Sequence, residues 1–239
     1  MKRYISVFEM IVRSSFYKVL LITGIMVVVQ AIGFGLTMMS PSGLMIEIYI
    51  DQSHYSLIFK IAYLLLTAVL VLHGMNIGSV QSYTLQRLRI PEKRIFWLQA
   101  LYNFFAYILL WGVQLMMILV SIFVYQKNLP DGVELSNQTM FIAFYRNDFM
   151  HSILPLEDVP GWSVLILIGI TSAFVTAEFT KLQREGKFAF EILLLLATVI
   201  ISFPRQLGYD AAFTLVGFAI VYMIMVMRWI MNVVGGDQP

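Results

Sequence analysis

Apolar residues gather in six long runs, and the segments between these runs carry nearly all of the charge. A helix needs about 20 residues to cross about 30 Å of hydrocarbon, and most of the runs reach that length. The pattern therefore predicts one all-α membrane domain over residues 1–239, with six transmembrane helices. The predicted spans are 19–39, 56–77, 95–125, 162–179, 188–203 and 211–231. The fifth span is the shortest, and Pro204 closes it.

Lysine and arginine are divided unevenly between the segments that alternate along the chain. If each run crosses the bilayer once, twelve of the sixteen Lys and Arg residues fall on one side. These are Lys2, Arg3, Arg13, Lys18, Arg87, Arg89, Lys93, Arg94, Lys181, Arg184, Lys187 and Arg228. The opposite side carries the other four, with eight of the fourteen carboxylates. Such a bias sets orientation, so we predict a multi-pass plasma-membrane protein with both termini in the cytoplasm.

Composition supports the same class. A chain with 59% hydrophobic residues, 13% charged residues and a mean hydropathy of +0.81 has too much apolar surface for one soluble core. The absence of cysteine excludes disulfides and thiolate metal sites. The positive charges are sorted by membrane side rather than gathered on a groove-binding face, so nucleic acid is not an expected partner. Membrane lipids are the expected partners of the apolar spans.

Residues 1–18 have the period of an amphipathic helix, at about 100° per residue. The apolar face comprises Tyr4, Ile5, Phe8, Ile11, Val12 and Phe16, and the polar face comprises Lys2, Arg3, Ser6, Glu9 and Arg13. A basic face opposite an apolar face is typical of a helix that lies in the plane of the membrane interface. The alternative is a juxtamembrane leader that only satisfies the positive-inside bias.

The cytoplasmic segment 82–94, SYTLQRLRIPEKR, predicts a short helix, a break and a second helix. The residue before a proline is pushed out of the helical region, so the first helix should end before Pro91. Pro91 is then the first residue of the next helix, with Glu92 in its first turn. The elbow carries the cations Arg87, Arg89, Lys93 and Arg94, and the apolar pair Leu85 and Leu88. We interpret it as a docking surface for another protein, with a solvated loop as the alternative.

These features together resemble the type-2 ABC exporter permeases. That family has an amphipathic helix before the first of six spans, and both chain ends lie inside the cell. After its second span comes a Thr-Leu-x-Arg-Leu core, then a proline or serine and a basic residue that leads into span three. The matching residues are Thr84, Leu85, Arg87, Leu88, Pro91 and Arg94. The topology resembles the family over the whole chain, and the sequence resembles it in this one segment.

The resemblance implies a permease that pairs with a second permease, as a homodimer or heterodimer, and with ATP-binding-cassette ATPase subunits. ATP and magnesium would bind to those subunits, so this chain is expected to hold no cofactor and no metal. The implied coupling helix that contacts the ATPase comprises Thr84, Leu85, Arg87, Leu88, Arg89, Pro91, Lys93 and Arg94. The implied connecting helix, residues 1–18, includes Ile5, Phe8, Glu9, Val12 and Arg13. In one departure, the long outer segment follows span three, whereas the family often places it between spans five and six.

That outer segment, residues 126–161, begins with turn-forming residues and continues with a stretch that is too apolar for a free loop. Charges interrupt the stretch too often for it to cross the bilayer. We predict a helix that lies at the outer surface and buries Phe141, Phe144, Phe149 and Ile153 against the spans. It acts either as a lid or substrate-contact surface, or as an ordered loop that only packs on its own spans.

Polar residues inside the predicted spans are the remaining candidates for function. Gln30, His73, Asn76 and Gln114 are candidate residues of a transport pathway, because polar groups in hydrocarbon usually face a bundle interior or a pathway. A lone histidine such as His73 in a span is more often hydrogen-bonded to a neighbouring helix than a proton relay. Glu178 and Glu191 are expected near the cytoplasmic span ends, where water reaches them.

The sequence therefore favours a permease subunit without catalysis of its own. It lacks a phosphate-binding loop, a His-Glu-x-x-His pair and a Gly-x-Ser-x-Gly turn. A pathway lined by Met, Phe, Leu and Ile suits an apolar or amphipathic cargo, such as a peptide or a lipid. The alternatives are a membrane-embedded sensor or accessory subunit that binds a cytoplasmic partner without transport, and a membrane enzyme of another type.

Overall fold

A computed structural model describes residues 2–39, 45–76, 91–128, 137–184 and 191–202, with the pairs 216–217, 219–220, 222–223 and 226–227. These residues form helices and turns, with no strand among them, as the all-α prediction requires. The helices are α1 (Lys2–Met38), α2 (Ile46–Gln52), α3 (Tyr55–Asn76), α5 (Glu92–Lys127), α6 (Asn137–Arg146), α7 (Asp148–Ile153), α8 (Val159–Arg184) and α9 (Glu191–Ser202).

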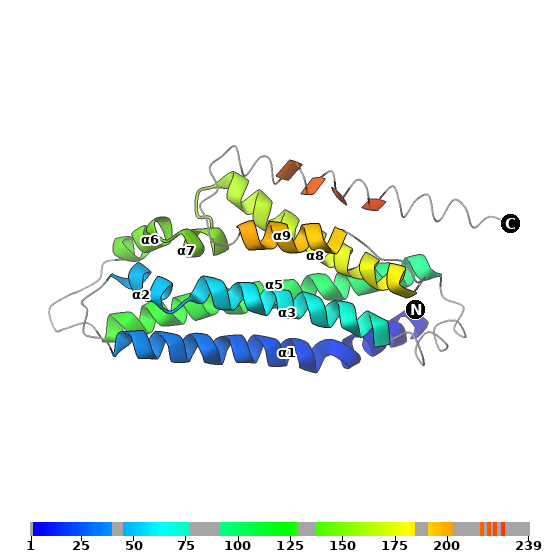
Figure 1. The fold of residues 1–239 in the computed structure, drawn as a ribbon, viewed down its shortest axis with the longest axis horizontal. Helices are drawn as coiled ribbons and strands as arrows, with labels where there is room; N and C mark the ends of the chain where they lie inside the picture. Colours follow the sequence, from blue (N-terminus) through cyan, green and yellow to red (C-terminus); the bar gives the residue numbers. More distant parts are fainter. Residues whose placement is uncertain are drawn as a thin grey trace.

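Four long helices, α1, α3, α5 and α8, run side by side along the long axis of the molecule (Figure 1). α1 packs against both α3 and α5, and α8 packs against the same two helices on the other side. The backbones of α3 and α5 come close to each other at few positions. The bundle is therefore diamond-shaped in section: α1 and α8 lie at opposite corners, and each of them contacts both α3 and α5.

Within the described residues, these four helices are long and apolar enough to cross a membrane. They coincide with the first four predicted spans up to Met38 on α1 and Asn76 on α3, and α5 is 36 residues long. At about 1.5 Å per residue, α5 is longer than the hydrocarbon is thick. α9 is 12 residues long, which is too short to cross within its described bounds. The fifth and sixth spans therefore stay predictions.

The interior of the bundle is built from one side of each long helix. On α1 the buried side chains follow a spacing of three or four residues: Ile11, Ser15, Val19, Ile22, Met26, Gln30 and Phe34. The opposite side is exposed and wholly aliphatic at Leu21, Ile25, Val28, Ile32 and Leu36. The buried side of α1 thus includes the polar residues Ser15 and Gln30 among apolar ones, whereas the opposite side is aliphatic, as expected when the surrounding solvent is hydrocarbon.

Three short helices, α2, α6 and α7, gather at one end of the bundle, opposite the N-terminus (Figure 1). The sequence did not predict α2, which ends where the backbone N–H and hydroxyl of Ser53 both donate to the carbonyl of Tyr49. His54 then adopts a φ of 55°, a left-handed conformation that is uncommon for a side chain other than glycine. This residue turns the chain from α2 into α3.

Candidate functional site

The basic ends of three long helices lie together at the end of the bundle that holds the N-terminus (Figure 1). They are the beginnings of α1 and α5 and the end of α8. Lys93 and Arg94 are exposed at the beginning of α5, and Arg13 is exposed on α1. The cations of these segments therefore share one end of the bundle, as the predicted topology requires. The side of a membrane on which this end lies stays a prediction.

Most of the predicted coupling helix, including Thr84, Leu85, Arg87, Leu88 and Arg89, lies outside the described residues. The described part begins at Pro91, which is exposed. Pro91 is the N-cap of α5 rather than its first helical residue, since its ψ of 131° is extended and the helix begins at Glu92. Its carbonyl accepts a hydrogen bond from the backbone N–H of Arg94. The predicted helix boundary was therefore one residue early.

The predicted connecting helix forms the first part of α1 and continues without interruption into the first span. Ile5, Glu9 and Arg13 are exposed, whereas Phe8 and Val12 are half-buried against the core. The predicted apolar face is not buried as a unit, because Ile5 is 65% exposed and Phe16 is 39% exposed. The location of this face in a membrane interface stays a prediction.

A hydroxyl pair attaches this first part of α1 to α5. Ser15 is fully buried, and its hydroxyl donates to the Tyr102 hydroxyl over 2.8 Å. Ile11, one turn before Ser15, is also buried. Ile11 and Ser15 thus mark the side of the helix that faces the protein. The amphipathic period of residues 1–18 did not indicate that Ser15 is the residue that contacts α5.

Two of the four candidate pathway residues contact each other in the interior. Gln30 of α1 and Gln114 of α5 are both fully buried, and Gln30 Nε2 donates to Gln114 Oε1 over 2.7 Å. Gln30 Oε1 and Gln114 Nε2 have no hydrogen-bond partner among the described residues. His73 and Asn76 belong to the last described turn of α3, and their side chains lie outside the described part. The structure therefore does not place them with the glutamine pair.

Further hydroxyl contacts join the long helices at other levels. Each has an oxygen-to-oxygen or nitrogen-to-oxygen distance between 2.5 and 2.9 Å. They pair Tyr55 with Ser121, Tyr63 with Ser172, Thr67 with Tyr107, and Asn103 with Thr176. Tyr107, Gln114 and Ser121 are seven residues apart, so α5 presents a polar contact to the interior at every second turn. These contacts fix which helix faces which.

An apolar cleft of about 270 Å³ lies between α3, α5 and α8, towards the α7 end of the bundle. Buried Phe59, Tyr63, Tyr107 and Ile168 form its floor. Phe104, Ile108 and Trp111 of α5 and Trp162, Leu165, Ile166 and Gly169 of α8 form its walls. The rings of Tyr63 and Tyr107 stack with their centroids 4.8 Å apart. The sequence did not predict this cleft, because the periodicity of one helix does not record how a neighbouring helix lies against it.

Two helices, α6 and α7, replace the single outer helix that the sequence predicted. The break falls at Asn147, whose side-chain oxygen accepts from the Met150 backbone N–H and caps α7. Phe144, Phe149 and Ile153 are buried as predicted. Phe141 is 58% exposed, which contradicts the prediction, because the break at Asn147 gives α6 and α7 separate buried sides.

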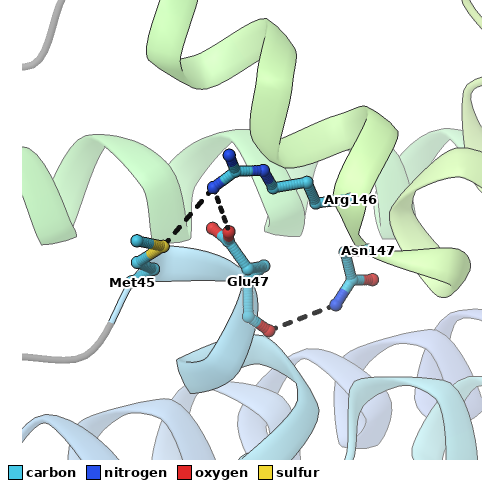
Figure 2. Close-up of polar contacts among 4 residues, drawn as sticks. All are labelled: Met45, Glu47, Arg146 and Asn147. Atoms are coloured by element: carbon cyan, nitrogen blue, oxygen red, sulfur yellow. Dashed lines mark hydrogen bonds and ion pairs between the residues drawn. The ribbon is translucent and has the colours of Figure 1, made fainter.

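Asn147 and Arg146 also connect α6 and α7 to α2. The Asn147 amide donates to the Glu47 carbonyl over 3.1 Å and to an Asp51 carboxylate oxygen over 2.8 Å. Arg146 lies 3.6 Å from the Glu47 carboxylate and, as Figure 2 shows, reaches the Met45 sulfur from the same side. We call α2, α6 and α7 the end cap. Asn147 is buried and Arg146 is exposed, so Asn147 contributes more to holding the cap together.

One expectation about acidic residues was wrong. Glu178 is only 4% exposed, and Lys181, one turn later on α8, is 7% exposed. The sequence predicts that Glu178 lies near a cytoplasmic span end that water reaches, whereas the structure buries its side chain on α8. Among the described residues, no three His, Asp or Glu side chains gather where a metal ion could bind.

Comparison with known proteins gives no family assignment. No protein-family model matches the chain, and searches of curated proteins and of solved structures find no significant match.

Proposed function

We propose that this chain is the membrane permease subunit of an ABC exporter and moves an apolar or amphipathic cargo. The energy comes from ATP hydrolysis on partner ATPase subunits, and a second permease completes the pathway. The observation that carries the proposal is the basic, exposed beginning of α5. It directly continues the segment that resembles a coupling helix, and it shares one end of the bundle with the N-terminal helix.

The geometry supports a mechanical link from that end to the rest of the bundle. α5 is one continuous helix of 36 residues, so a displacement at Pro91 is carried along its whole length. The hydroxyl and amide contacts of α5 with α1, α3 and α8 pass the displacement to those helices. Midway along α5, the Trp111 indole donates to the Ile153 carbonyl of α7, so the end cap follows α5. Binding or release of an ATPase can therefore change the outer end of the pathway.

The test is charge reversal at the beginning of α5. The double substitution Lys93→Glu and Arg94→Glu should abolish co-purification of an ATP-binding subunit in mild detergent, measured by mass spectrometry. The physical reason is that charges at the rim of an interface control association. Lys127→Glu is the matched control, because Lys127 is an exposed cation at the opposite end of the same helix.

Recovery of an ATP-binding subunit with the wild type and the control, but not with the double variant, supports the permease. Equal recovery with both variants contradicts docking at this end. Recovery of a kinase or protease in place of an ATP-binding subunit, with no ATP hydrolysis in the complex, favours the sensor or accessory subunit.

A further inference from the structure

We propose that the cleft between α5 and α8 binds one acyl chain of a membrane phospholipid. This inference requires the long helices to span a membrane, and it is independent of any ATPase partner. It can therefore hold or fail separately from the permease proposal.

The chemistry of the lining selects an apolar ligand. All eleven lining residues are aromatic, aliphatic or glycine. The hydroxyls of the two floor tyrosines already have partners, because Tyr63 is bonded to Ser172 and Tyr107 to Thr67. The tyrosines thus present ring surface to the cleft rather than unsatisfied polar groups. A charged or strongly polar ligand would lose its hydration here without compensation.

The size of the cleft suits a chain rather than a single small group. An apolar cavity of about 150 Å³ in a protein stays free of water and takes up benzene. The cleft here, at about 270 Å³, is larger and is bordered by helices that leave a lateral mouth. Water gains nothing by entering it, because the lining offers too few hydrogen-bond partners. An alkyl segment fills such a space and recovers the dispersion contacts that an empty cleft forfeits.

The position of the mouth identifies the membrane as the source of that segment. Ile108 of α5 and Ile166 of α8 border the cleft, and they are 42% and 54% exposed. The mouth is continuous with the exposed apolar surfaces of two candidate spans, which face lipid in a membrane. Trp162 lines the cleft at the beginning of the predicted fourth span, and tryptophan is enriched where hydrocarbon meets the headgroups. An acyl chain can thus enter sideways while its headgroup stays at the interface.

Gly169 provides a specific test. It lines the cleft, and a Cβ added there meets no atom within 4 Å, so Gly169→Leu should fill the cleft without a clash at the backbone. Gly24→Leu is the matched control, since Gly24 is an exposed helical glycine of α1 with the same open surroundings. The full chain is placed in phosphatidylcholine vesicles that contain a phosphatidylcholine with a photoreactive diazirine on its acyl chain.

After irradiation, digestion and mass spectrometry, we expect labels to be enriched severalfold in residues 104–111 and 162–169 over the exposed side of α1. Gly169→Leu should remove this enrichment, and Gly24→Leu should retain it. In the wild type, cleft labelling should also saturate as labelled lipid is increased, whereas labelling of α1 should rise in proportion. The saturation measurement decides the question if Gly169→Leu does not fold.

Equal labelling of all exposed apolar segments, without saturation, would overturn the proposal. A photoreactive benzoylphenylalanine substituted for Ile108 separates the possible occupants. A lipid adduct supports the acyl chain, whereas a cross-link to a second copy or to another segment of the same chain shows that protein fills the cleft.

Discussion

At the scale of single residues, the interior depends on polar side chains that find one another across helices. Gln30 and Gln114 are the clearest case, because both are fully buried and lie on different helices. A polar pair in an apolar interior fixes the rotation of each helix, since rotation would leave both groups unpaired. The sequence identified both glutamines as polar residues in spans. It could not pair them, because spacing along one helix does not reveal which helix is the neighbour.

This pairing predicts a non-additive mutant cycle. Gln30→Leu or Gln114→Leu alone should lower the free energy of unfolding by about 1–3 kcal/mol, because the remaining amide stays buried without its partner. The double variant should lose less free energy of unfolding than the two single variants lose in sum. Unfolding in mixed micelles with increasing dodecyl sulfate, followed by circular dichroism, measures the cycle.

The control is Gln52→Leu, at an exposed position on α2, which should leave the free energy of unfolding nearly unchanged. Additive losses in the double variant would mean that the two amides do not stabilise each other.

Two glycines of α8 predict opposite outcomes for the same substitution. A Cβ at Gly161 would lie 2.7 Å from Pro155 Cβ and 2.8 Å from an Asp158 carboxylate oxygen. Gly161→Ala should therefore destabilise the start of α8 by about 1–3 kcal/mol, as overpacking does. Gly169→Ala meets open space and should gain up to about 1 kcal/mol from helix propensity. Thermal unfolding in mild detergent compares the two, and equal shifts would contradict the close contact at Gly161.

At the scale of helices, long apolar periodic segments were predicted well and short ones poorly. The described residues of the first four predicted spans fall on α1, α3, α5 and α8, to within one residue of the helix ends. α2 was missed because 7 residues are too few to show a period. α6 and α7 were predicted as one helix, because the capping contact of Asn147 depends on the Met150 N–H and on α2 beyond it. Capping side chains mark possible helix ends, but the tertiary partner decides which of them is used.

The end cap should loosen when Asn147 is truncated. Asn147→Ala removes the N-cap of α7 and both side-chain bonds to α2, so residues 141–153 should exchange amide hydrogens faster. A lost N-cap costs about 0.5–2 kcal/mol. The free energy of local opening, calculated from the exchange rates of residues 141–153, should fall by that amount or more. Hydrogen–deuterium exchange with mass spectrometry measures it.

Asn128→Ala provides the comparison, because Asn128 is exposed and its side chain bonds only to the Val124 carbonyl of its own helix. Equal protection of residues 141–153 in both variants would show that Asn147 does not hold the cap.

At the scale of the whole molecule, the basic helix ends and the end cap lie at opposite ends of the bundle. The beginnings of α1 and α5 lie at one end, and the end cap lies at the other (Figure 1). The charge pattern predicted this division, because a helix that crosses once must change sides. The orientation in the cell follows from the same bias and can be measured directly, since the chain contains no cysteine.

Single cysteines at exposed positions should react with a membrane-impermeant maleimide from one side only. Lys93→Cys should be labelled only after the membrane is opened, whereas Gln52→Cys and Asp148→Cys should be labelled in intact cells. All three positions are exposed and lie near helix ends. Labelling of Lys93→Cys and Gln52→Cys from the same side would be incompatible with a bundle that crosses the membrane.

The distribution of side chains on α1 has a consequence for making the protein soluble. The positions that carry the internal contacts and the positions that touch the surroundings are separate sets on this helix. The outward set, which includes Leu21, Ile25, Val28 and Ile32, is more than half exposed in the part of the chain that the structure describes. Such outward residues, on α1 and on the other long helices, could be replaced by glutamate and lysine. Water would then become the preferred solvent in place of hydrocarbon, and the interior contacts would stay in place. The side chains that determine the fold and the side chains that determine the preferred solvent thus lie on opposite sides of the same helix.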